Sequence, residues 1–208
     1  MRAGVFITLE GIEGVGKSTH ALYIRERLEQ HGFQTVLTRE PGGTKTGEAI
    51  REILLHATSS PISDLTELLL IFSARAQHLQ EIIIPALKAN KVVICDRFTD
   101  ATYAYQGGGR EIDRQQIQIL EAFVQEGLKP DLTILLDTPI EIGLGRANHR
   151  SKADRFESET VNFFQRVRQE YLELARSEPE RIQVIDANRP LQQIQQDIDS
   201  ILAARKLC

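Results

Sequence analysis

The sequence predicts an α/β fold in which a five-stranded parallel sheet is flanked by helices on both faces. Short apolar, β-branched runs alternate with stretches of helical periodicity along the chain. A glycine-rich turn joins the first of these runs to a helical pattern, and turn residues follow the later ones. The expected strands are Val5–Leu9, Thr35–Thr38, Val92–Cys95, Leu132–Leu136 and Ile182–Ile185.

The segments between the strands have the features of helices. Residues 19–28 place Leu and Ile at helical spacing directly after the glycine-rich turn. Asp137-Thr138-Pro139 is a typical helix start, with proline in the first turn. Residues 64–90 form a long helical stretch, dense in Leu and Ile, that Pro85 interrupts. The polar, charged segment 145–159 is predicted to be a mobile lid, because it has few apolar groups to hold it down.

The composition fits a compact globular protein. A length of 208 residues suits one domain, 1–208, with a substantial core. The net charge of −4 argues against general nucleic-acid binding, which needs a basic surface. No apolar run reaches membrane-spanning length, and we expect no signal peptide because the sequence enters the first strand almost at once. Cys95 and Cys208 are too few for a disulfide framework or a metal cluster. We expect a cytoplasmic protein in which Cys95 is buried.

A complete phosphate-binding P-loop pattern, G-x-x-x-x-G-K-[ST], is formed by Gly11-Ile12-Glu13-Gly14-Val15-Gly16-Lys17-Ser18. Gly14 and Gly16 let backbone N–H groups approach a polyphosphate closely. Lys17 can reach its outer phosphates, and the Ser18 hydroxyl can ligate Mg²⁺. The alternative is a chance glycine turn that enters a helix. The apolar strand before the pattern and the helix after it favour a nucleoside triphosphate site.

Further polar residues follow the second and third strands. Asp96 ends the third strand, where a P-loop protein places the acid that organises Mg²⁺, and Arg97 beside it can grip phosphate oxygens. A salt bridge at the strand end is the alternative. The tight turn Thr38-Arg39-Glu40-Pro41-Gly42-Gly43-Thr44 could hold a small polar molecule. The stretch Ala104-Tyr105-Gln106-Gly107-Gly108-Gly109-Arg110 indicates backbone packed against a ligand, or else a flexible turn.

These motifs together resemble thymidylate kinases of the bacterial type, in order and spacing over nearly the whole chain. The most specific are Thr38-Arg39-Glu40-Pro41-Gly42-Gly43-Thr44 and Ala104-Tyr105-Gln106-Gly107, which supplement Asp96-Arg97-Phe98 and the P-loop. The resemblance implies the P-loop nucleoside monophosphate kinase fold. It also implies transfer of the γ-phosphoryl group of ATP to dTMP with Mg²⁺, and a homodimer.

The resemblance implies a role for each matching residue. For ATP it implies Gly11, Ile12, Glu13, Gly14, Val15, Gly16, Lys17, Ser18 and Thr19, with Arg146 and Arg189. For dTMP it implies Glu13, Glu40, Arg51, Phe72, Arg75, Arg97, Thr102, Tyr105 and Gln106, with Phe72 stacked on the thymine and Tyr105 against the 2′ position. Mg²⁺ is assigned to Ser18 and Asp96. The catalytic residues are Lys17, Arg97, Arg146 and Arg150.

The chain departs from the family pattern at position 71, at position 101 and at Phe98, where Tyr or His is also common. The stacking aromatic usually lies four residues before the base-reading arginine, where this chain has Ile71, and position 101 is Ala instead of Ser. Some thymidylate kinases carry a P-loop arginine where this chain has Gly14. Without that arginine, the transition state needs a cation from elsewhere, and Arg146 and Arg150 in the lid are the candidates.

Two other functions are compatible with a P-loop. A GTP-binding switch protein is faintly suggested by Ser151-Lys152-Ala153-Asp154, but this stretch lies in the polar lid and does not follow an apolar strand. A kinase acting on another small acceptor is the second. Arg51 and Arg97 favour an acceptor that already carries a phosphate, because an unphosphorylated nucleoside would leave both unpaired.

Overall fold

The computed structural model describes residues 4–56, 61–148, 155–157 and 159–207. Its centre is a five-stranded sheet in the order β2-β3-β1-β4-β5, and every neighbouring pair is parallel. The strands are β1 (Val5–Glu10), β2 (Thr35–Arg39), β3 (Val92–Asp96), β4 (Leu132–Asp137) and β5 (Ile182–Asp186). The predicted α/β class is therefore confirmed. Each strand begins at its predicted residue and continues for one more, which is charged in every case. All five charged residues thus lie at the carboxyl edge of the sheet.

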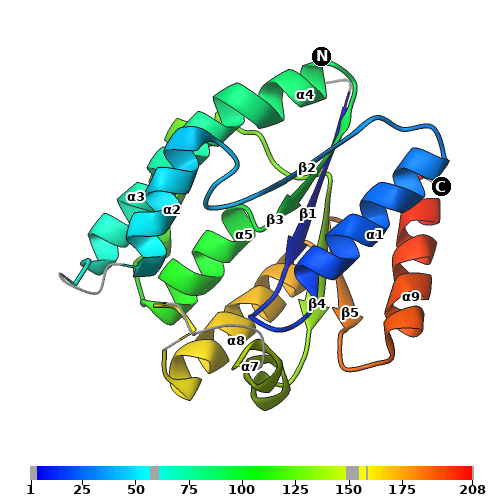
Figure 1. Ribbon diagram of the computed structural model, residues 1–208. Coiled ribbons are helices and arrows are strands. Elements are labelled where there is room, and N and C mark those ends of the chain that lie inside the picture. The colour runs from blue at the N-terminus through cyan, green and yellow to red at the C-terminus, as the bar shows by residue number, and fades with distance from the viewer. Residues whose placement is uncertain (1–3, 57–60, 149–154, 158, 208) are drawn as a thin grey trace.

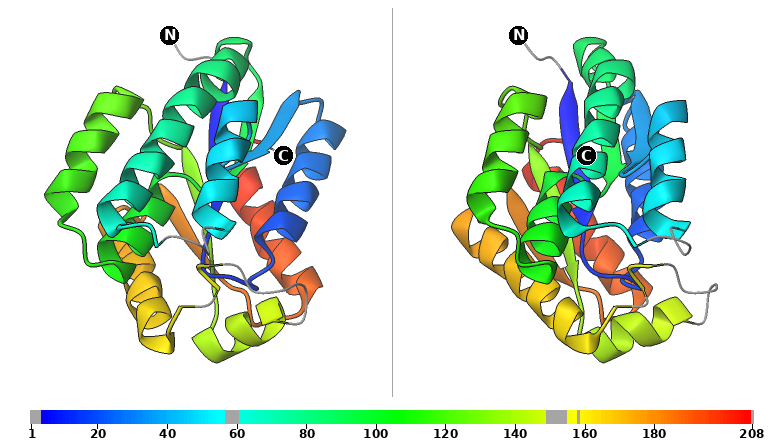
Figure 2. Two further views of the ribbon diagram at one scale, coloured as in Figure 1. Left: turned by 60° about the vertical axis from the view of Figure 1, so that its left-hand side comes forward. Right: turned by 90° about the vertical axis from the view of Figure 1, so that its left-hand side faces the viewer.

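Helices cover both faces of the sheet. Figure 1 shows α1 (Lys17–Gln30, blue) and α9 (Leu191–Ala204, red) on one side. On the other side lie α3 (Asp64–His78), η1 (Leu79–Ile83), α4 (Ile84–Lys88), α5 (Thr99–Thr102), η2 (Tyr103–Gly109) and α8 (Val161–Ser177). In Figure 2, α2 (Lys45–His56) and α6 (Arg114–Gln125) flank α3, while α7 (Ile140–Asn148) lies at the carboxyl edge. Within the described ranges, no helix is long and apolar enough to cross a membrane.

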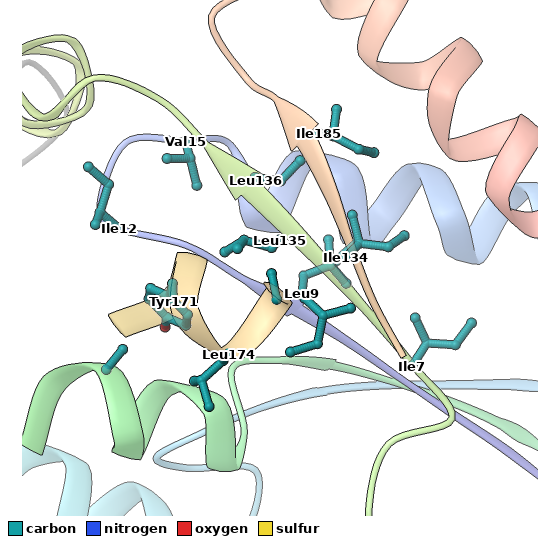
Figure 3. Packing of buried hydrophobic residues seen from close by; sticks show 14 of the residues in the cluster. Ile7, Leu9, Ile12, Val15, Ile134, Leu135, Leu136, Tyr171, Leu174 and Ile185 are labelled. Atoms are coloured by element: carbon teal, nitrogen blue, oxygen red, sulfur yellow. The ribbon is translucent and has the colours of Figure 1, made fainter. Parts of the chain in front are cut away.

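The core lies between the sheet and these two helical layers. Figure 3 shows apolar side chains of β1, β4 and β5 packed on one another, with Tyr171 and Leu174 of α8 against them. A smaller cluster, under η1 and α4, includes Cys95, which is fully buried as predicted. The main cluster draws on residues from Ile7 to Leu207, so segments from both ends of the described chain share it.

Two segments wind more loosely than an α-helix. The predicted long helix is a continuous rod, α3–η1–α4, in which η1 is a π-helical turn just before Pro85. The wider turn fits the missing N–H of proline into the rod without breaking it. The glycine-rich stretch is also π-helical, as η2. A Cβ on Gly109 would lie 2.4 Å from the Phe163 ring of α8, and one on Gly108 would lie 2.9 Å from the carbonyl oxygen of Arg166 on the same helix. These two glycines therefore serve close packing on α8, which corrects the prediction that they pack against a ligand.

Candidate active site

The P-loop occupies the turn between β1 and α1. Gly14 and Gly16 have φ angles of 73° and 90°, in the left-handed region that favours glycine. Lys17 is the first residue of α1, and its ammonium donates to the carbonyl oxygens of Ile12 at 2.7 Å and Gly11 at 3.1 Å. Burial, and then the charge of Arg97, lowers the pKa of Lys17 to about 8. The loop therefore positions a poorly hydrated cation at the mouth of the phosphate cradle.

Helix α7 packs directly on this loop through two glycines. A Cβ on Gly14 would lie only 1.9 Å from the carbonyl oxygen of Gly143 in α7. A Cβ on Gly143 would in turn lie 2.8 Å from the carbonyl oxygen of Glu13. Side chains at either position would separate the two backbones. The P-loop and the helix that leads into the predicted lid are thus in backbone contact.

Two oxygen ligands meet beside the lysine. The Ser18 hydroxyl donates to Asp96 Oδ2 at 3.0 Å, which joins the start of α1 to the carboxyl end of β3. Such a pair suits Mg²⁺, which takes one or two protein oxygens and completes its shell with phosphates and water. Among the described residues, no cluster of three or more His, Cys, Asp or Glu side chains offers a denser metal site.

Arg97 is the most heavily bonded cation of the site. Its backbone is left-handed, with φ 70°, a strained conformation for a non-glycine residue that directs the side chain back toward β1. The guanidinium donates to Glu13 Oε1 at 2.8 Å, the Tyr105 hydroxyl at 2.9 Å, the Gly11 carbonyl at 3.0 Å and the Tyr171 hydroxyl at 3.1 Å. These contacts fix the arginine beside Lys17 before any phosphate binds.

A buried carboxyl group supports Arg97 from below. Glu10 ends β1 and is completely buried, with Oε1 accepting from the backbone N–H of Phe98 at 2.7 Å. Its Oε2 lies 2.7 Å from the hydroxyl of Tyr171, the residue that also contacts Arg97. Burial, with the charge of Asp100 adding to it, raises the pKa of Glu10 to about 8. Glu10 is therefore largely protonated at neutral pH.

This shift makes stability depend on pH. Glu10 ionises near pH 4.5 in the unfolded chain but near pH 8 in the folded protein. Between these values the folded state binds more protons, so the free energy of unfolding should fall as pH rises from about 4.5 to 8. At about 1.4 kcal/mol per pKa unit, the loss is on the order of 5 kcal/mol. Urea unfolding gives the free energy of unfolding of the parent protein and of Glu10→Gln at each pH in this range. The difference between the two values should decrease as pH rises. A flat difference would contradict it.

The far end of the site contains a second arginine, Arg75 of α3, which is 1% exposed. Its Nε donates to Glu40 Oε2 at 2.8 Å, and Nη2 donates to the Thr102 hydroxyl at 2.9 Å and the Phe98 carbonyl at 3.2 Å. Its Nη1 is buried and has no hydrogen-bond partner in the described part of the chain. A buried donor of this kind costs free energy unless a ligand accepts from it.

A histidine that the sequence did not single out braces this arginine. His78, fully buried, lies 3.0 Å from Glu40 Oε1 through Nδ1 and 2.6 Å from the Thr38 hydroxyl through Nε2. The charge of Arg75 and the hydrogen bond from His78 lower the pKa of Glu40 against its burial. Glu40 therefore holds Arg75 from inside the protein.

The cavity between these two ends measures about 340 Å³. It gathers most of the predicted residues: Glu13, Gly14, Lys17, Ser18, Glu40, Arg51, Arg75, Asp96, Arg97, Thr102, Tyr105 and Gln106. Arg51 donates to the carbonyl of Pro41 at 3.0 Å. The wall also contains Ile71, Leu55 and Phe156, to which the motifs of the sequence gave no role. The remaining P-loop residues and Thr19 lie outside this lining.

The predicted stacking residue, Phe72, needs correction. Phe72 is 2% exposed, belongs to the main core cluster and is absent from the cavity lining, whereas Ile71 lines it. The Phe72 ring packs under Arg75, with its centroid 4.8 Å from the guanidinium carbon. Position 71 is one turn before Arg75 and shares its cavity-facing side. The family spacing, which pointed to position 71, was the signal that could have identified it.

The predicted ATP-side arginines lie outside the cavity lining. Arg146, near the end of α7, donates to the carbonyl of Ala187 at 3.0 Å, and Arg189 forms an ion pair with Asp197 of α9. Arg146 thus contacts the turn between β5 and α9, and Arg189 belongs to that turn. Arg150 lies outside the described residues, as does the stretch Ser151-Lys152-Ala153-Asp154.

This geometry defines a P-loop phosphotransferase with an acceptor pocket beside its triphosphate cradle. The chain belongs to the thymidylate kinase family, whose model matches residues 9–198. It is 56% identical over 199 residues to a thymidylate kinase of Ectopseudomonas mendocina (strain ymp), with 96% of this chain and 95% of that protein covered. A Pseudomonas putida (strain GB-1) thymidylate kinase is 54% identical over 200 residues, with the same coverage. The crystal structure of thymidylate kinase from Ehrlichia chaffeensis superposes with a TM-score of 0.77 at 34% identity, covering 96% of this chain and 99% of that one.

Proposed function

We propose that this protein phosphorylates dTMP to dTDP with Mg²⁺-ATP, a step in dTTP biosynthesis. The observation that carries the proposal is Arg75, which lines a cavity that continues to Lys17 and whose buried Nη1 has no hydrogen-bond partner among the described residues. Thymine presents an acceptor at O4 and a donor at N3, so Arg75 serves the first and the Gln106 side-chain oxygen the second. Cytosine reverses both groups and would leave the buried arginine unpaired.

The reaction needs few protein groups. The dTMP phosphate is already an anionic nucleophile, so no general base is required. Arg97 and Arg51 hold this phosphate in line with the γ-phosphate of ATP, while the P-loop N–H groups and Lys17 hold the donor. Lys17 offsets the charge that develops on the transferred group. Ser18 and Asp96 would hold Mg²⁺, which neutralises the donor phosphates when bound.

The sugar is held between Glu13 and Tyr105. Both oxygens of Glu13 accept from the Tyr105 hydroxyl, at 2.7 and 2.8 Å, so the phenol ring is fixed in the cavity wall. This ring crowds the 2′ position, which favours deoxyribose, and Glu13 is available to the 3′-hydroxyl. The base lies on Ile71, an aliphatic platform in place of a stacked aromatic ring.

A substrate panel tests the proposal. ADP release should be fastest with dTMP, slower but real with dUMP, which lacks only the methyl group, and very slow with dCMP, AMP, GMP and thymidine. GTP in place of ATP should support little turnover. Equal rates with dCMP and dTMP would contradict the proposed base contacts. Rapid phosphorylation of thymidine would contradict the proposed role of the paired arginines.

We also infer a homodimer in the cytoplasm. Exposed apolar side chains gather on three adjacent helices, Ile53 on α2, Leu65 and Leu69 on α3, and Ile119 and Phe123 on α6. Figure 2 shows α2, α3 and α6 side by side. Phe123 is 81% exposed and Ile119 is 68% exposed, and their spacing puts them on one face of α6. An apolar surface of this kind suits a second copy of the same chain.

A single substitution that introduces a charge into this apolar surface tests the dimer. Phe123→Asp should convert the protein to a monomer in light scattering at micromolar concentration, because it buries an unpaired carboxylate in the interface. The matched control is Leu191→Asp, which changes an exposed leucine of α9 on the other face of the molecule and should leave the mass unchanged. A monomeric parent protein, or a dimeric Phe123→Asp protein, would contradict the inference.

A further inference from the structure

A buried acid, Glu67, occupies the end of the site that reads the base. It lies on α3 about two turns before Arg75 and is fully buried. Its Oε1 accepts from the amide nitrogen of Gln106 at 2.7 Å. Two guanidinium groups complete its shell: Arg155 donates to Oε2 at 2.5 Å, and Arg110 donates to both oxygens at 3.3 Å.

The contact between Glu67 and Gln106 fixes the orientation of an amide. A glutamine side chain carries a donor nitrogen and an acceptor oxygen of almost equal shape, so packing alone does not choose between its two orientations. A carboxylate only accepts hydrogen bonds, and Gln106 must therefore turn its nitrogen toward Glu67. Its oxygen then takes the opposite place, in the cavity that Gln106 lines.

We propose that Glu67 is a positioning residue that sets base selectivity by holding the Gln106 oxygen toward the ligand. The inference rests on the proposed function, in which that oxygen accepts from N3–H of thymine. If the amide were reversed, its nitrogen would face the N3 acceptor of cytosine instead. Glu67 thus determines whether the Gln106 amide pairs with thymine or with cytosine, although Glu67 itself does not contact the substrate.

The two arginines account for the burial of this acid. A carboxylate removed from water is strongly destabilising unless cations and hydrogen bonds surround it. Arg110 is itself tied to Glu159 at 2.5 Å, and the Arg155 side chain also donates to the carbonyl of Leu54 at 2.8 Å. These contacts hold the carboxylate in place. They also supply a competing explanation, in which Glu67 is only an anchor for Arg110 and Arg155.

The decisive measurement is the ratio of kcat/KM for dTMP to kcat/KM for dCMP. Glu67→Gln nearly conserves shape but gives position 67 both a donor and an acceptor, so Gln106 is free to turn. The ratio should fall by about tenfold or more, mainly through a higher KM for dTMP, with KM for ATP unchanged. Gln106→Ala provides the lower limit of discrimination. Glu67→Gln combined with Gln106→Glu restores an acceptor-only group at position 106 and should recover much of the ratio.

Arg155→Gln is the matched control for the anchoring explanation. It removes a cation from Glu67 but leaves the contact with Gln106, so the ratio should stay at the parent value even if kcat falls. A folded Glu67→Gln protein that keeps the parent ratio would overturn the inference, as would an equal loss of ratio in Arg155→Gln. If Glu67→Gln does not fold, Glu67→Asp replaces it. Its shortened carboxylate should lower the ratio in the same direction, and an unchanged ratio would again overturn the inference. A parent protein that fails to prefer dTMP would instead refute the proposed function.

Discussion

Lys17→Ala is expected to lower kcat by about 10³-fold or more while the protein remains folded, because it removes the cation that meets the transferring phosphoryl group. Within the part of the chain that the structure describes, the Lys17 ammonium donates to the carbonyls of Gly11 and Ile12 in the P-loop, so its loss should cost little stability. A coupled ADP-release assay with dTMP gives the rate, and circular dichroism checks the fold. Lys88→Ala, at an exposed position on α4, is the matched control and should behave like the parent. Near-parent turnover in a folded Lys17→Ala protein would contradict phosphoryl transfer at this site.

The same lysine should also produce a pH limit in the free enzyme. Burial lowers the pKa of Lys17 to about 8, so the ammonium form is complete below that value and is lost above it. We therefore expect kcat/KM for ATP, which reports the free enzyme, to decline above about pH 8. The decline should be weaker in kcat, because bound phosphates favour the charged lysine.

The second large effect is expected at the lid. Arg150→Ala should lower kcat by about 10²-fold or more, with little change in dTMP binding, because no P-loop arginine is present to stabilise the transition state. Arg146→Ala should act mainly on KM for ATP, since Arg146 holds the carbonyl of Ala187 in the turn that precedes Arg189. Steady-state kinetics on both single variants separate the two roles. Parent-like kcat and KM values in both would show that these arginines are ordinary surface charges.

Features with a local signature could be predicted from the sequence. The strands were predicted to within one residue, because buried parallel strands are continuous apolar runs that end where the chain meets water. The P-loop and Asp96 could also be predicted, because each consists of particular residue types at a fixed distance in sequence from the end of a strand. The cavity brings Lys17, Asp96 and Arg97 together as that rule requires.

Features that depend on contacts between distant segments could not be predicted. In the sequence, Glu67 resembles any acidic residue near a helix start. Its role is visible only from its three hydrogen-bond partners, which are Gln106, Arg110 and Arg155. Glu10 and Tyr171 are 161 residues apart. The choice between Ile71 and Phe72 depended on the rotation of α3 about its axis, which local composition does not determine. Only the family spacing, four residues before Arg75, indicated position 71.

The backbone contact between Gly14 and Gly143 restricts how this enzyme could evolve. An arginine at position 14 would place its Cβ where the Gly143 carbonyl now lies, so it could enter only after α7 had moved away. Moving α7 first would displace the segment that carries Arg146 and leads to Arg150. An arginine at position 14 without movement of α7 would clash with Gly143, and movement of α7 without that arginine would displace Arg146 and the segment that leads to Arg150. Neither change is therefore favourable alone. If the lid supplies the transition-state cation as predicted, a P-loop arginine and a lid arginine are alternative solutions separated by an unfavourable intermediate.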